Sequence, residues 1–80
     1  MKVPVVKKLV ETHNIETLNE AENAIMEERQ PDIKVEGDDE GEQLTHLLAA
    51  IAILEDMKAN DLPFNKALRN YSQRVRKSIS

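Results

Sequence analysis

The stretch of sequence that decides the fold reads Leu44-Thr45-His46-Leu47-Leu48-Ala49-Ala50-Ile51-Ala52-Ile53-Leu54. At the 100° spacing of an α-helix its larger side chains fall on one main stripe, formed by Leu44, Leu47, Leu48, Ile51 and Leu54. The alanines and Ile53 extend the apolar character around the rest of the helix. Because a helix that is apolar on all sides must be enclosed on all sides, the sequence predicts a central helix over residues 42–60.

Three further helical segments are predicted around this one, over residues 4–12, 15–29 and 63–80. Each has an apolar stripe at helical spacing, and a proline lies close to three of the boundaries, at Pro4, Pro31 and Pro63. Asn14 stands where a side chain can cap the second segment. We therefore expect one all-α domain over residues 1–80, a small helical bundle of three long helices plus a short N-terminal one.

An acidic connector is predicted at about residues 31–42, where both glycines of the chain lie. Ile33 and Val35 alternate with polar residues, but a strand without a partner is not stable, so this segment is predicted to be a loop. A calcium loop needs oxygen ligands at alternate positions, and Lys34 occupies one of them when the loop is counted from Asp32. We interpret the carboxylates as favourable neighbours of the next helix's N-terminus.

The composition limits the location of the chain. The longest apolar run, residues 47–54, has eight residues, against roughly 20 needed to cross a bilayer. The sequence has no cysteine and no recognisable secretion signal at its start. A cytoplasmic protein that does not enter the membrane is the expectation.

Charge is unevenly distributed along the chain. With three basic against fifteen acidic residues, residues 11–61 carry a net charge of −12, whereas residues 62–80 carry +5. A small core of 80 residues is marginal by itself, and segments of opposite charge attract each other within one chain or between copies. This pattern favours association with a second copy or with another protein.

No catalytic residues and no cofactor are predicted. The chain lacks glycine-rich nucleotide motifs, a nucleophile elbow and any thiol. Four polar side chains on or near apolar faces form the first alternative, a small metal or acid–base site built from His13, Glu22, Glu42 and His46. The structural interpretation is favoured, in which Glu42 and His46 form a local i,i+4 pair and Glu22 meets Arg29, His13 or a backbone donor.

The last helical segment has a basic face that contains Lys66, Arg69 and Arg76. Nucleic-acid binding by this face is a second alternative, and it is disfavoured because the domain as a whole is acidic. Its two aromatic residues, Phe64 and Tyr71, also lie on the apolar face, away from the arginines.

Three stretches resemble a family of short bacterial proteins classed as a domain of unknown function. They are residues 3–13 (VPVVKKLVETH), 40–46 (EGEQLTH) and 74–76 (RVR). The resemblance covers nearly the whole chain and implies a small bacterial cytosolic protein. It brings no activity, cofactor or site residue.

The function that the sequence favours is a non-enzymatic protein–protein interaction module, a homodimer formed through the central apolar helix. The residues predicted to form its interface are Ala49, Ile53, Lys66, Arg69 and Arg76.

Overall fold

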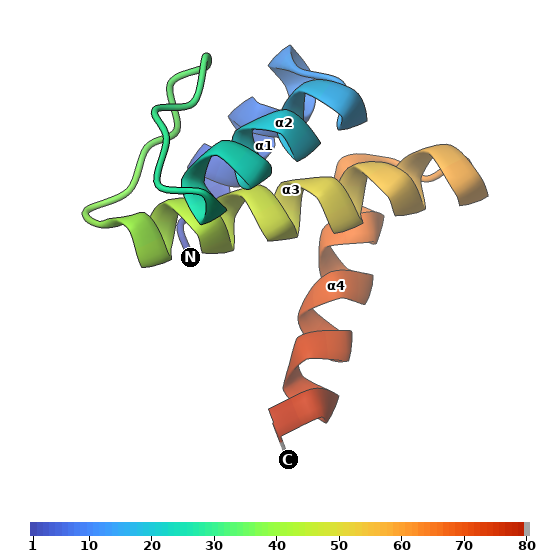
Figure 1. The fold of residues 1–80 in the computed structure, drawn as a ribbon. Coiled ribbons are helices and arrows are strands. Elements are labelled where there is room, and N and C mark those ends of the chain that lie inside the picture. The colour runs from blue at the N-terminus through green and yellow to red at the C-terminus, as the bar shows by residue number, and fades with distance from the viewer. Residues whose placement is uncertain (80) are drawn as a thin grey trace.

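Four helices make up the computed structural model, which describes the backbone of residues 1–79 and the side chains of residues 1–77 (Figure 1). They are α1 (Val3–Thr12), α2 (Ile15–Met26), α3 (Glu40–Asn60) and α4 (Phe64–Ile79). No strand occurs among residues 1–79. The prediction of an all-α chain is therefore confirmed.

Helix α3 is the centre of the arrangement, and α1, α2 and α4 each pack against it. Helices α1 and α2 lie along one side of α3, whereas α4 crosses behind α3 and its second half runs away from the body on the opposite side (Figure 1). The predicted bundle is thus confirmed only in part, because three helices share α3 as a common support and the end of α4 projects.

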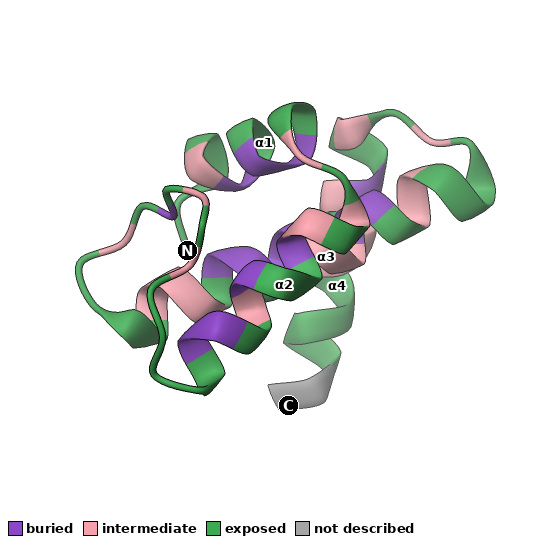
Figure 2. Cartoon of the chain, turned by 45° about the horizontal axis from the view of Figure 1, so that its top comes forward, coloured by how far each residue is buried: buried purple, intermediate pink, exposed green. Residues whose placement is uncertain are grey.

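The core forms where α1, α2 and the start of α4 cover α3. Its fully or almost fully buried side chains are Val6, Leu9, Val10, Leu18, Ala21, Ile25, Val35, Leu47, Ala49, Ala50, Ile53, Leu54 and Ala67. Most of them lie on the inner faces of the three helices of the body (Figure 2). Small side chains such as Ala49, Ala50 and Ala67 let neighbouring helices approach α3 closely, which explains how so short a chain covers so much of it.

The face of α3 that points inward differs from the one predicted. Ala49 and Ile53 retain no exposed surface, whereas Leu48 is 47% exposed and Leu44 and Ile51 are half-buried. The apolar character all round α3 was recognised correctly, and Leu47 and Leu54 of the predicted main stripe are buried. Ala49 and Ile53 were placed on the outer side and lie inside, whereas Leu48 was placed inside and lies at the surface. Periodicity could not decide this, because both faces are apolar and the choice depends on where the other helices pack.

Capping fixes where the helices begin. The Asn14 side chain accepts a hydrogen bond from the Thr17 N–H at 2.8 Å, so the predicted cap of α2 is confirmed. Helix α3 begins at Glu40, two residues before the predicted start, because Asp39 accepts from the Glu42 N–H at 2.8 Å. The Glu42 carboxylate accepts in turn from the Asp38 N–H, also at 2.8 Å. These reciprocal bonds satisfy N–H groups that a helix start leaves free.

Helix α2 ends at Met26, three residues before the predicted end. Glu28 has the left-handed conformation, with φ of 58°, and its N–H and that of Arg29 donate back to Ile25 and Ala24. The connector then covers residues 27–39. It tucks Val35 into the core and passes close to α3 at Gly37, where a Cβ would lie 2.8 Å from the Gln43 backbone nitrogen.

The projecting end of α4 gives the chain a large surface. A compact protein of 9.1 kDa is expected to expose about 4,900 Å², and this chain exposes 5466 Å². The difference agrees with Figure 1, in which the second half of α4 leaves the body. Ile79, predicted on the apolar face of this helix, lies outside the described side chains.

No helix among the described residues combines the length and the apolar character required to cross a membrane.

Candidate functional site

The corner between α3 and α4 is an open apolar hollow of about 360 Å³. It lies where the projecting half of α4 turns away from the N-terminal half of α3, and the chain start borders it. Its lining residues are Met1, Thr45, Tyr71, Ser72, Val75 and Arg76.

An apolar stripe on α3 continues the hollow on one side. Leu48 follows Thr45 by three residues and therefore lies next to it on the helix surface. Leu44, Leu48 and Ile51 form this stripe, which we call the α3 outer stripe. Leu48 keeps 47% of its surface exposed, whereas Leu44 and Ile51 are half-buried and Ile51 packs against the core. The stripe therefore presents Leu48 as its exposed large side chain, with half-buried apolar neighbours on either side.

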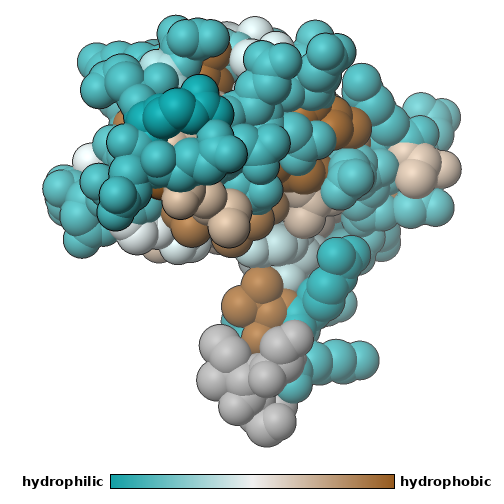
Figure 3. Space-filling model, in the orientation of Figure 1, coloured by the Kyte–Doolittle hydropathy of each residue, from teal (hydrophilic) through white to brown (hydrophobic). Residues whose placement is uncertain are grey.

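A second stripe runs along α4, and we call it the α4 stripe. It consists of Leu68, Ser72 and Val75, which recur at intervals of four and three residues and so share one face. Val75 is 38% exposed. In Figure 3, hydrophobic atoms appear on the projecting arm beside strongly hydrophilic ones. The two stripes together form the corner surface.

The predicted interface residues divide into two groups. Lys66, Arg69 and Arg76 are exposed on α4, and within the described residues none of them reaches a carboxylate at ion-pair distance. Ala49 and Ile53 have no exposed surface in the single chain. Since a residue without accessible surface cannot touch a second copy, the candidate interface has to shift from the Ala49 side of α3 to the opposite, Leu48 side.

His46 is fully buried and is held by two backbone groups. The Lys2 N–H donates to its Nε2 at 2.9 Å, so Nδ1 carries the ring proton and donates to the Glu36 carbonyl at 2.8 Å. The imidazole thus joins the start of α1 and the connector to α3. The predicted pair of Glu42 with His46 is wrong, because Glu42 caps α3 and both nitrogens of His46 bond elsewhere.

The structure does not bring the predicted metal or acid–base site together. His46 contacts Lys2 at the start of α1, whereas His13 follows the end of that ten-residue helix, which is about 15 Å long. Arg29 pairs with Glu27 instead of Glu22. In the described part of the chain, no three histidine, aspartate or glutamate side chains are placed to hold a metal ion.

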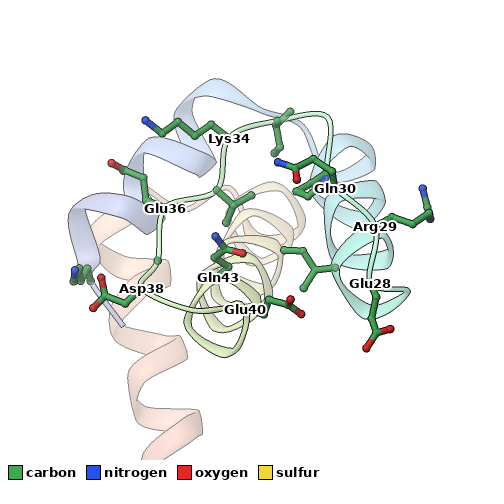
Figure 4. A pocket seen from close by; sticks show the side chains of 14 residues that line it. Glu28, Arg29, Gln30, Lys34, Glu36, Asp38, Glu40 and Gln43 are labelled. Atoms are coloured by element: carbon green, nitrogen blue, oxygen red, sulfur yellow. The ribbon is translucent and has the colours of Figure 1, made fainter.

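A larger hollow of about 720 Å³ lies beneath the connector. In Figure 4 the Gln43 side chain points into the ring formed by the connector, whereas Glu28, Arg29, Lys34 and Glu36 point away from it. Charged groups that diverge cannot stabilise a common reacting centre. This hollow is therefore a polar opening below a loop and offers no arrangement for catalysis.

Asp56 sets the position of α4 relative to α3. Its carboxylate accepts from the Asn70 side chain of α4 at 3.1 Å and from the Asn60 side chain at 2.6 Å. The hydrogen bond from Asn70, then that from Asn60, lowers the pKa of Asp56 from 3.8; desolvation opposes the shift and the charge of Arg74 adds to it. The ionised carboxylate thus acts as a bridge that fixes the angle of the corner.

Sequence reasoning missed Leu48, Tyr71 and Val75 as surface residues. One signal was present: the apolar spacing of α4 continues to Val75, far from the loop that joins this helix to α3, where the body of the chain no longer covers it. For Leu48 there was no signal, because its neighbours around α3 are just as apolar.

No curated protein and no protein of known structure matches this chain. One family model does, and it covers residues 1–80, the full length of the chain. The chain belongs to the family of unknown function DUF6952.

Proposed function

We propose that this chain is a non-enzymatic protein–protein interaction module that self-associates, and that the corner surface is its contact. The observation that carries the proposal is that the two stripes meet at an apolar hollow and each leaves one large apolar side chain at the surface, Leu48 at 47% and Val75 at 38% exposure. Apolar surface gathered in one place marks a site where another molecule binds.

The occupant that the charges favour is a second copy. The corner joins a helix from the segment with net charge −12 to the basic helix α4. A second copy carries the same acidic and basic sides, so the basic α4 of one copy can face the acidic α3 side of the other. This replaces the central-helix contact through Ala49 and Ile53 by one through the other face of the same helix.

The size of the surface indicates how the contact must spread. A stable interface buries about 800 Å² per partner, which is roughly 15% of the 5466 Å² exposed by the chain. The hollow alone is too small for this. The contact therefore has to extend along both α3 and α4.

Nucleic acid is the less favoured partner. The net charge of the chain is −4, which repels phosphate over most of the surface. Tyr71 borders the apolar hollow, where Arg76 is the one basic neighbour among the described lining residues, and Phe64 packs against the core. The two aromatic side chains are thus not interleaved with the basic residues as a surface for stacking bases requires.

The same proposal places the module in the bacterial cytoplasm. Two features support this localisation: the composition without cysteine, and the resemblance of residues 3–13 and 40–46 to short bacterial proteins. Fractionation of a bacterial host that expresses the tagged chain tests it, and recovery in the membrane or periplasmic fraction would contradict it.

Sedimentation equilibrium at micromolar to high micromolar concentration tests the self-association. We expect a species of twice 9.1 kDa for the native chain. Leu48→Gln and Val75→Gln should each weaken it while the monomer keeps its helical content by circular dichroism. Covering the exposed half of a leucine is worth about 1 kcal/mol, hence about 2 kcal/mol for two copies, which corresponds to roughly a 30-fold rise in Kd.

Met26→Gln is the matched control, because Met26 is 66% exposed on α2, away from the corner. It should leave the association unchanged. A native chain that remains monomeric throughout, or a dimer that Met26→Gln weakens as much as Leu48→Gln, contradicts the proposal.

A further inference from the structure

We infer that the second copy docks reciprocally, with α4 of each copy lying across the α3 outer stripe of the other and Arg69 and Arg76 facing Glu55 of that other copy. This inference rests on the proposed function, since it requires that the corner surface is a contact between copies. It adds which surfaces meet and which charges select them.

The α4 side carries a basic edge next to its apolar stripe. Arg69 and Arg76 are seven residues apart, so they lie on one edge of the helix, about 10.5 Å from each other. At 100° per residue this edge is adjacent to Ser72, on the side of the helix that faces the hollow. A partner that covers the α4 stripe therefore comes within reach of both guanidinium groups.

The α3 side carries an acidic residue in register with its apolar stripe. Glu55 follows Leu48 by seven residues and lies on the same exposed face, one turn beyond Ile51. Glu55 thus continues the outer stripe at its C-terminal end. A helix laid along Leu44, Leu48 and Ile51 thus meets a negative charge at the end of the stripe.

These charges have no partners within the described part of the single chain. Neither Arg69 nor Arg76 reaches a carboxylate, and Glu55 reaches no basic group at ion-pair distance. Charge pairs that close only across an interface contribute selectivity in the choice of partner. Arg69, Arg76 and Glu55 are therefore available to form ion pairs with a second copy.

The alternative contact, α4 against α4, is disfavoured by the same charges. It would bring Lys66, Arg69 and Arg76 of both copies together, and like charges across an interface oppose association. Docking of α4 on α3 brings opposite signs together instead. In a two-fold dimer this contact occurs twice, because residue i of one copy touches j of the other and j touches i.

Charge reversal and mixing test this arrangement. Arg69→Glu/Arg76→Glu places acids against Glu55, and Glu55→Lys places bases against the arginines, so each variant alone should dimerise at least about tenfold more weakly. When the two variants are mixed, a dimer of one copy of each has two attractive contacts. In one contact the introduced glutamates face the introduced lysine, and in the other the native arginines face the native Glu55. Native mass spectrometry separates the mixed dimer from the two homodimers by mass, and we expect the mixed dimer to dominate.

Lys7→Glu on α1 and Glu20→Lys on α2 are the control variants, because both residues are exposed on helices away from the corner. They should dimerise like the native chain, and mixing them should give no preference. Circular dichroism and thermal melting of every variant establish that its monomer is folded.

The outcomes separate the two proposals. If Leu48→Gln weakens the dimer but mixing gives only the statistical share of mixed dimers, the corner is the contact and the reciprocal arrangement is overturned. If the native chain stays monomeric, both fail. A monomer that shifts a short DNA duplex at low salt, and loses this with Arg69→Glu/Arg76→Glu, would assign the basic edge to nucleic acid instead.

Discussion

His46 shows how one residue can hold together segments that are distant in the sequence. It is the buried polar side chain of the described core, and both of its nitrogens bond to backbone groups, at Lys2 and at Glu36. A buried polar group is tolerated when its hydrogen bonds are complete. In this chain these hydrogen bonds also hold the start of the chain and the connector against α3, so His46 has a structural role.

Replacing His46 should destabilise the fold. His46→Leu keeps the volume but leaves the Lys2 N–H and the Glu36 carbonyl without their partner, which costs about 1–3 kcal/mol of unfolding free energy. Urea denaturation measures this loss, and amide exchange at Lys2 should accelerate. His13→Leu is the control, because His13 is half-buried at the end of α1; its effect should stay within about 0.5 kcal/mol. Equal losses in both variants would contradict the role assigned to His46.

At the scale of the helix, α2 and α3 both end on a left-handed residue that is not glycine. These are Glu28, with φ of 58°, and Asp61, with φ of 53°. At both ends an N–H donates to a carbonyl five residues earlier, from Arg29 to Ala24 and from Leu62 to Met57. This pattern is the Schellman ending, in which glycine is the favoured residue because a Cβ is strained in that conformation.

Glu28→Gly should therefore stabilise the chain. Relief of the left-handed strain is worth about 0.5–1 kcal/mol, a gain that the greater freedom of glycine in the unfolded chain partly offsets. Glu20→Gly, in the middle of α2, is the matched control and should cost about 1 kcal/mol. Thermal melting of the two variants gives the comparison, and a loss of stability in Glu28→Gly would show that its side chain has a role that the φ angle does not reveal.

The connection between α3 and α4 depends on the charge of Asp56. The pKa of Asp56 is lowered in the folded chain, so the folded chain binds fewer protons than the unfolded chain in the window below about pH 4. This contribution is fully present above the ordinary pKa of 3.8. It is lost as the pH falls through the lowered folded-state value.

Asp56→Asn should remove this acid dependence. At neutral pH the variant should melt below the native chain, and the difference should shrink as the pH falls below about 4, where the unfolded chain and then the native carboxylate become protonated. Melting curves over this range measure the change. Glu11→Gln, on the exposed surface of α1, serves as the control. A difference between Asp56→Asn and the native chain that stays constant with pH would contradict the assignment.

For the whole molecule, the segregation of charge predicts how salt acts on association. Residues 11–61 carry −12 and residues 62–80 carry +5. Because contacts between exposed charges are screened over about 10 Å at 0.1 M salt, the Kd of the dimer should rise as salt is added. Leu48→Gln should raise the Kd of the dimer by the same factor at low and high salt, since the contact made by Leu48 is apolar. A dimer that tightens with salt would indicate that burial of apolar surface alone determines it.

Much of the fold could be predicted from the sequence because its signals are local. Helical periodicity identified all four helices, and the Asn14 cap was predicted at the residue where it occurs. The end of α2 was placed too late, because a glutamate at Glu28 gives no sign of a left-handed ending. The site was predicted less well, since Arg69 and Arg76 were recognised but their apolar neighbours were not.

The sequence by itself determined that residues 42–60 form a helix whose middle is apolar around its circumference, because side-chain spacing within one helix is a local property. Only the tertiary structure decided which side of that helix faces inward. Ala49 and Ile53 are covered because α1, α2 and α4 approach closely over small side chains, and Leu48 is left at the surface. The physical reason is that both sides are apolar, so their choice depends on contacts between helices that are distant in the sequence.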